Sequence, residues 1–262
     1  MTRDKSGPII REKVKGVPEV ERLIRRGDIL SANALKILGA LAMLVDHVGV
    51  MFFPQVELLR IVGRLAYPIF AFMIAQGCAH TRNRGRYFLR VFALAAVCQI
   101  VYYLAERSTY MSILVTFSCG IGMICALQDF KRELFSGGGD VYWAGAEFVL
   151  AVVLVWLLNW VLRIDYGFWG CMVPVFASLF QSRDTDPEWL RKLDRKEVHV
   201  AMTGLGLGLL SWSVGGIQVW CLLALPVLLL YSGKRGKWKL KYFFYIFYPA
   251  HLAILQAIAW LL

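Results

Sequence analysis

Three ionisable residues lie inside one apolar stretch of the chain, and their types and spacing are suited to chemistry. The stretch runs from Asn33 to Pro54 and contains Lys36, Asp46 and His47. About twenty apolar residues suffice for a helix to cross a bilayer, and charge inside such a helix is costly enough to be a functional hypothesis by default. Lys36 and His47 are eleven residues apart, so on a helix they share one face at roughly 16 Å separation.

Histidine is the natural candidate for a general base here. Its side chain changes protonation state near neutral pH, so His47 can take a proton from a hydroxyl or an amine. A histidine that only packs against a neighbouring helix is the alternative. Asp46 lies about 100° further round the helix and either orients the imidazole or pairs with an arginine. His251, beside Pro249 in the last apolar segment, can reach the depth of His47, and helix packing explains it equally well. The predicted catalytic residues are His47, Asp46 and His251.

Two arginines, Arg60 and Arg64, lie one turn apart at the start of the second apolar segment. Asp46 and Asp165 are plausible counter-charges, and a structural ion pair inside the membrane is the simpler explanation. Arg64 could also stabilise an oxyanion. Asp165 and Tyr166 belong to a turn that either only connects two spans or lines the entrance for a second substrate. The predicted substrate-binding residues are Arg60, Arg64, Asp165, Tyr166 and Tyr248.

The loop from His80 to Arg90, HTRNRGRYFLR, carries four arginines. Such a loop is typical of the cytoplasmic side of any membrane protein. Guanidinium groups also bind phosphate oxygens in pairs, and Arg86 and Arg90 are one turn apart on a helix. Because Lys36 opens onto the same surface, a phosphate-bearing ligand is the functional alternative. The predicted anion-binding residues are Lys36, Arg82, Arg84, Arg86 and Arg90.

The composition places these residues in a membrane protein. Of the 262 residues, 58% are hydrophobic and the mean hydropathy is +0.57, whereas soluble domains are roughly half apolar. We therefore predict an all-α polytopic integral membrane protein, a bundle of about nine transmembrane helices, with eight or ten as alternatives. The predicted spans are 34–53, 58–79, 87–104, 110–127, 142–162, 166–181, 199–213, 216–232 and 242–261, of which the sixth and seventh are short or glycine-rich.

The basic residues lie mostly between these spans. With the N-terminus in the cytoplasm, 24 of the 29 Lys and Arg residues fall in inner segments, as the positive-inside rule predicts. The chain therefore divides into a basic cytoplasmic segment, 1–32, and a membrane domain, 33–262, in the cell (inner) membrane with lipid around it. This topology explains the net charge of +11, so no nucleic-acid partner is expected. No cleavable signal peptide is expected, and the six cysteines, all in apolar stretches, are expected neither to form disulfides nor to bind a metal.

Several segments resemble the TraX family of membrane proteins, which is named for F-pilin acetylation. They are LKILGALAMLVDHVG, LRIVGRLAYPIFAFMIAQGCAHTRNRGRYFLR, DYGFWG and GKRGKWKLKYFFYIFYPAHL, in this order over most of residues 33–251. TraX proteins are in turn similar to the membrane acyltransferase-3 superfamily, whose motif is a basic residue, ten residues and then a histidine. Lys36 and His47 have this spacing. The chain differs from the family at Ser112, in SILVTFSCG, where an asparagine is usual, and this leaves acceptor specificity open.

The resemblance implies an enzyme that transfers an acetyl group, or another acyl group, from acetyl-CoA or acyl-CoA to an amine or a hydroxyl. It implies that His47 is the catalytic base, that Lys36 lies near the CoA-binding side and that the Arg82–Arg90 segment contacts the CoA phosphates. The acceptor can be a pilin N-terminus, an envelope glycan or a small molecule, and the oligomeric state, including a homo-oligomer, is open. The alternatives are a proton-coupled transporter, since intramembrane Asp, His and Arg also form proton relays, and a non-catalytic membrane assembly factor. A transporter is expected to have paired halves, and none stands out in this sequence.

Overall fold

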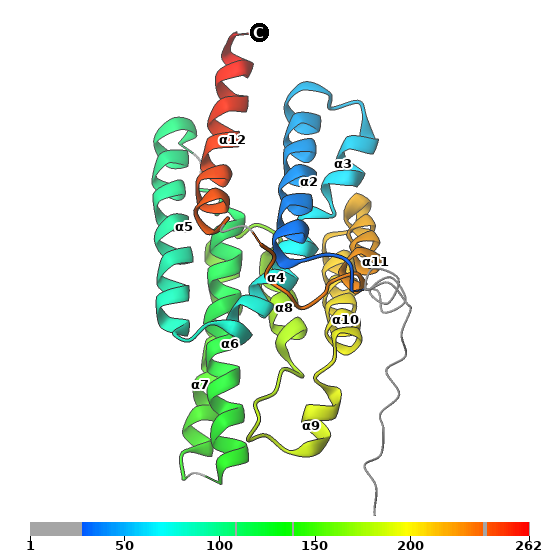
Figure 1. The fold of residues 1–262 in the computed structure, drawn as a ribbon. Coiled ribbons are helices and arrows are strands. Elements are labelled where there is room, and N and C mark those ends of the chain that lie inside the picture. The colour runs from blue at the N-terminus through cyan, green and yellow to red at the C-terminus, as the bar shows by residue number, and fades with distance from the viewer. Residues whose placement is uncertain (1–27, 108, 138, 238–239, 262) are drawn as a thin grey trace, which may run out of the picture.

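A computed structural model of the chain describes residues 28–107, 109–137, 139–237 and 240–261 (Figure 1). Residues 1–27, most of the predicted segment 1–32, lie outside the described residues. The described part is a bundle of helices. They are α2 (Ala32–Phe52), α3 (Glu57–Gly63), α4 (Ala66–His80), α5 (Arg84–Glu106), α6 (Ile113–Ser136), α7 (Val141–Val161), α8 (Gly167–Ser178), α9 (Glu188–Leu193), α10 (Lys196–Val214), the 3-10 helix η1 (Gly216–Leu223), α11 (Ala224–Leu229) and α12 (Lys241–Leu261).

Each of the nine predicted spans overlaps a helix, but within the described residues six of them are long and apolar enough to cross a membrane. These six are α2, α3 with α4, α5, α6, α7 and α12. The other three predicted spans correspond to α8, to α10, and to η1 with α11. α8 has twelve residues, about 18 Å of helix, whereas the hydrocarbon core is about 30 Å thick. The chain is thus a multi-pass, all-helical membrane protein in its described residues, and the number of nine spans is not confirmed, because length as well as apolarity decides which segments can cross.

The second apolar segment is interrupted where its arginines lie. α3 ends at Gly63, so Arg64 falls at a junction rather than inside a continuous helix. α3 packs closely against α2 because glycines face the contact. A Cβ at Gly49 would lie 2.8 Å from Leu59 Cβ, and a Cβ at Gly63 would overlap the side chain of Asp46. This close approach brings the α3 arginines within reach of Asp46.

α8 lies in the middle of the bundle, with α4, α6 and α10 packed around it (Figure 1). Glycines again allow the close packing. A Cβ at Gly120 of α6 would lie 2.6 Å from Pro174 Cγ, and a Cβ at Gly206 of α10 would lie 3.3 Å from Val173 Cα. The helices α5, α7 and α12 by contrast are largely exposed along their length and carry large apolar side chains on their surfaces. Contiguous apolar surface of this kind is typical of contact with a membrane.

The start of α2 is joined to a segment far along the chain. Residues 29–33 pair with residues 230–235 through backbone hydrogen bonds. Ala32 N–H donates to the Lys234 carbonyl at 2.8 Å. Asn33 N–H donates to the Arg235 carbonyl at 3.2 Å. We call these two segments together the α2 clamp. It holds Arg235 beside the first turn of α2, and it also holds the chain shortly before α12 begins.

Candidate functional site

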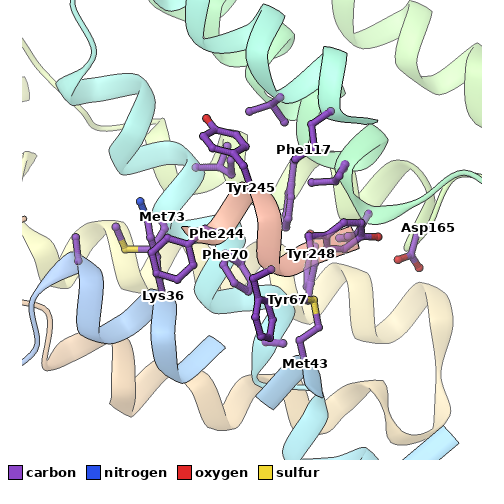
Figure 2. A pocket seen from close by; sticks show the side chains of 18 of the residues that line it. Lys36, Met43, Tyr67, Phe70, Met73, Phe117, Asp165, Phe244, Tyr245 and Tyr248 are labelled. Atoms are coloured by element: carbon purple, nitrogen blue, oxygen red, sulfur yellow. The ribbon is translucent and has the colours of Figure 1, made fainter. Parts of the chain in front are cut away.

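An elongated cavity of about 360 Å³, which we call the central cavity, lies between α2, α4, α5, α6 and α12. Figure 2 shows Lys36 on one side of it and Asp165 on the other, with aromatic side chains such as Phe244 and Tyr248 between them. A volume of this size is within the range typical of small-molecule pockets. Both Lys36 and His47 line it, so the cavity follows the face of α2 that carries them.

His47 contacts His251, which approaches from α12. His47 Nδ1 lies 2.8 Å from the Met43 carbonyl, and His251 Nδ1 lies 2.8 Å from the Phe247 carbonyl. These carbonyl partners assign the proton of each neutral ring to Nδ1. His251 Nε2 therefore has a lone pair and lies 3.3 Å from His47 Nδ1, so the single Nδ1–H of His47 is shared between this nitrogen and the nearer Met43 carbonyl. The ring centroids are 5.0 Å apart. His47 Nε2 keeps its own lone pair, which can take a proton from a molecule in the cavity.

Asp46 pairs with two arginines rather than with His47. Its Oδ2 accepts from Arg60 Nη1 at 2.9 Å, and Arg64 Nη2 donates to both carboxylate oxygens, at 3.1 and 3.2 Å. The sequence suggested that Asp46 either orients the imidazole of His47 or pairs with an arginine, and the structure shows the ion pair. Neither arginine lines the central cavity, so both influence it through lining residues that they contact, such as Asp46.

Tyr166 and Asp165 line the central cavity from the start of α8. Tyr166 has a φ of 60°, a left-handed conformation that is uncommon for residues other than glycine, and its ring stacks on Tyr67 at 4.3 Å between centroids. Arg64 Nη1 donates to the Tyr166 oxygen at 3.3 Å, so the phenolic O–H is still able to donate. Asp165 in turn accepts from the Tyr110 hydroxyl at 2.6 Å. Backbone strain that surrounding contacts maintain is typical of functional sites.

Three basic residues, Lys36, Arg90 and Arg235, line the same cavity, and we call the part lined by Lys36 and Arg235 its basic end. Lys36 Nζ lies 5.9 Å from the ring centroid of Phe244, within the range of a cation–π interaction. Arg235 is held near Lys36 by the α2 clamp. Arg235 is not among the site residues predicted from the sequence, because it belongs to a basic segment that topology alone explains. Only the pairing of the clamp brings it to the cavity.

The remaining predicted anion-binding arginines lie elsewhere. Arg82 and Arg84 line a second pocket of about 760 Å³, and the exposed Arg86 lines neither pocket. Arg84 and Arg90 lie six residues apart on α5, about 120° apart round the helix, so they face different neighbours. Among the predicted site residues, those that line the central cavity are Lys36, Asp46, His47, Arg90, Asp165, Tyr166 and Tyr248.

Comparison with known proteins points to one family. The model of the family described as TraX protein matches residues 31–259. Uncharacterized protein RP591 of Rickettsia prowazekii (strain Madrid E) is 24% identical over 154 residues, which are 59% of this chain and 57% of that relative, so the match spans little more than half of the Rickettsia protein. Probable fimbrial assembly protein FimC, serogroup H1, of Dichelobacter nodosus is 25% identical over 254 residues, with 86% of this chain and 94% of that relative covered. No solved structure matches. Because the family model covers nearly the whole chain, the protein belongs to the TraX family.

Proposed function

We propose that this protein is a membrane acyltransferase that moves an acetyl or other acyl group from cytoplasmic acyl-CoA to an amine or hydroxyl acceptor. The observation that carries the proposal is the central cavity, because one space is lined both by the basic end and by His47. Eleven residues separate Lys36 from His47, about 16 Å of helix. This spacing suits an extended pantetheine arm, with phosphates at the basic end and the thioester beside His47. Membership of the TraX family and the resemblance to membrane acyltransferase-3 proteins support the same reaction.

His47 is the general base in this proposal. The acceptor gives its N–H or O–H proton to His47 Nε2 while its nitrogen or oxygen attacks the thioester carbonyl carbon. The Tyr166 hydroxyl, whose oxygen already accepts from Arg64, donates to the oxyanion that forms. Collapse of this intermediate breaks the carbon–sulfur bond, and the departing thiolate takes the proton from His47. The products are the acylated acceptor and the CoA thiol, and His47 returns to its starting state.

His251 is a positioning residue for this base. Its Nε2 shares the Nδ1–H of His47 with the Met43 carbonyl. The two acceptors together hold the tautomer of His47 and stabilise the imidazolium that forms during transfer. A carboxylate plays the corresponding part in a Ser-His-Asp triad. A neutral imidazole is a weaker acceptor than a carboxylate, so we expect His251→Gln to lower kcat about tenfold or more while KM for acyl-CoA changes little. A loss confined to KM would contradict this role.

Because His47 acts by removing one proton from the acceptor, the acceptor is a molecule with an amine or a hydroxyl. The printed name of the Dichelobacter relative concerns fimbrial assembly, and the TraX family is named for pilin acetylation. A pilin N-terminal amine is therefore the first acceptor to test, and an envelope glycan and a small-molecule amine are the next two. The alternative of a non-catalytic assembly factor would share the pilus connection without the chemistry.

The deciding experiment measures transfer by the purified full-length protein in lipid nanodiscs, with labelled acetyl-CoA and each acceptor in turn. We expect His47→Ala to lower the rate by about a hundredfold or more while acetyl-CoA still binds. His80→Gln is the matched control, because His80 is exposed at the end of α4 and does not line the central cavity. Full activity in His47→Ala would refute the mechanism.

Binding of the donor has its own test. Arg235→Gln should weaken acetyl-CoA binding about tenfold, the loss of one charge-assisted contact worth about 1.5 kcal/mol. Arg191→Gln removes the same charge from the exposed helix α9 and should have no effect. If millimolar acetyl-CoA does not bind to the folded wild-type protein, the acyltransferase is ruled out and a proton-coupled transporter becomes the better explanation of the intramembrane charges.

A further inference from the structure

A second basic pocket lies between α5 and α6, apart from the central cavity. Its charged lining residues are Arg82 and Arg84 near the start of α5, Arg132 and Asp129 near the end of α6, and Arg183 from the segment between α8 and α9. We call it the arginine pocket. Its volume is about 760 Å³, and it shares no lining residue with the central cavity. The proposed acyl transfer therefore does not account for it.

The arginine pocket has an excess of positive charge. Four arginines face one lining carboxylate, Asp129. Asp129 Oδ1 lies 3.0 Å from Arg132 Nη1 and 3.9 Å from Arg84 Nη1, so one carboxylate oxygen holds two guanidinium groups near each other. Arg82 and Arg183 have no ion pair among the described residues.

Two further carboxylates lie near the pocket without lining it. Glu133 Oε1 lies 3.1 Å from Arg132 Nε, and Asp186 accepts the backbone N–H of Arg183. Burial and the nearby guanidinium groups lower the pKa of Arg183, which reflects this crowding, although an arginine stays charged at neutral pH. The four arginines outnumber the carboxylates even when both of these are counted, so the pocket attracts an anion.

The arginine pocket also has apolar lining residues. Phe88 of α5 and Gly122 and Cys125 of α6 belong to its lining, and the uncharged Thr81, Asn83 and Gly85, from the turn that leads into α5 and its first residues, complete it. The Phe88 ring stacks on Phe92, with centroids 5.6 Å apart. Phe92 is 48% exposed and Leu89 beside it is 61% exposed, on a helix of membrane length. The arginines thus stand at the end of an apolar helix surface suited to lipid chains.

We propose that the arginine pocket binds the phosphodiester headgroup of an anionic phospholipid of the adjoining membrane leaflet. A soluble phosphate compound would use the same guanidinium groups, but it would make no use of the exposed apolar surface of α5. A phospholipid uses both, with its phosphate on the arginines and an acyl chain along α5. Basic pockets between transmembrane helices are recognised sites for anionic lipid headgroups. The inference is independent of the acyl transfer proposed above.

Lipid selectivity of the purified full-length protein tests this. Dioleoyl-phosphatidylglycerol is titrated into detergent micelles, with dioleoyl-phosphatidylcholine as the neutral lipid and 3′,5′-ADP as the soluble phosphate, and thermal unfolding is followed by tryptophan fluorescence. We expect phosphatidylglycerol to raise the unfolding midpoint by several degrees more than phosphatidylcholine does. In Arg84→Gln/Arg183→Gln its apparent affinity should fall at least tenfold. The control Arg191→Gln/Arg195→Gln removes the same charge from exposed positions and should keep the wild-type response.

Three results would overturn the proposal. The first is equal stabilisation by the two lipids, and the second is a lipid selectivity that the double variant retains. The third is competition by 3′,5′-ADP that the double variant loses, because this result would make the pocket a site for soluble phosphate. If the double variant does not fold, Arg82→Gln takes its place, because Arg82 is exposed and its side chain has no ion pair among the described residues. It should weaken phosphatidylglycerol binding several-fold. The readout involves no acyl transfer, so its failure and the failure of the enzymatic proposal are distinguishable.

Discussion

Replacing Asp46 with asparagine tests the charge cluster beneath the candidate site. The substitution keeps the size of the side chain but leaves Arg60 and Arg64 facing a neutral amide, with side chains that are 26% and 12% exposed. Removing one partner of a buried ion pair costs about 3–5 kcal/mol, and this partly exposed cluster should lie near the lower end, about 3 kcal/mol. Since 1 kcal/mol corresponds to roughly 2–4 °C for a chain of this size, the unfolding midpoint should fall by roughly 6–12 °C.

The assay is thermal unfolding in nanodiscs at one scan rate, applied to a double-mutant cycle of Asp46→Asn and Arg64→Gln. We expect the double variant to be less destabilised than the sum of the single variants, by about 1–3 kcal/mol, because each single change leaves the other charge without its partner. Arg60→Gln is the internal comparison and should cost less, since Arg60 is more exposed and donates to one carboxylate oxygen. Strictly additive costs would refute the ion pair as the role of Asp46 and return it to the orientation of His47.

Three further predictions concern single positions. Gly63→Ala should lower the free energy of unfolding by about 1–3 kcal/mol, because a Cβ there would overlap the α2 aspartate, and an unchanged unfolding midpoint would contradict the close helix contact. Tyr166→Phe should lower kcat for acyl transfer by about tenfold to a hundredfold with KM nearly unchanged, as measured in the labelled acetyl-CoA assay. Although burial opposes it, the contact with His199 Nε2 at 3.0 Å and the hydrogen bonds from Ser182 hold the pKa of Asp194 below its usual value, which is about 3.9. The stability that ionised Asp194 contributes is therefore complete above its usual pKa and is lost as pH falls through its lower folded-state pKa. The difference in unfolding midpoint between the wild type and Asp194→Asn should shrink as pH falls from about 6 to about 3.

Features set by local periodicity could be predicted from the sequence. Eleven residues of α-helix bring two side chains back to one face, and Lys36 and His47 both line the central cavity. The all-helical, multi-pass character follows from apolar windows in the same way. An ion pair between Asp46 and an arginine was one of the two roles predicted for Asp46, because opposite charges inside a membrane generally pair. Each of these conclusions depends on residues within one helix or on charge balance alone.

The remaining features depend on contacts between distant segments. Arg235 lies at the central cavity because the α2 clamp pairs its backbone with Asn33, and nothing within its own segment indicates this. The division of the arginines between two pockets depends on which neighbour each face of α5 contacts. The break at Arg64 likewise depends on packing, since the residues around it would also suit an uninterrupted helix. Hydropathy alone could not separate the short central helix α8 from a helix of full membrane length, because both are apolar.

The α2 clamp also sets how the chain can tolerate changes in length. α2 begins within this clamp, and α12 begins at Lys241, six residues beyond Arg235. His47 lies fourteen residues beyond Asn33, and His251 lies sixteen residues beyond Arg235. The contact between the two imidazoles therefore depends on the number of residues that separates each histidine from the clamp. A single residue inserted between Asn33 and His47 would turn His47 by about 100° and move it about 1.5 Å, away from its partner and from the cavity. Residues added before the clamp would change neither separation, so we expect such an insertion to leave the contact between His47 and His251 intact.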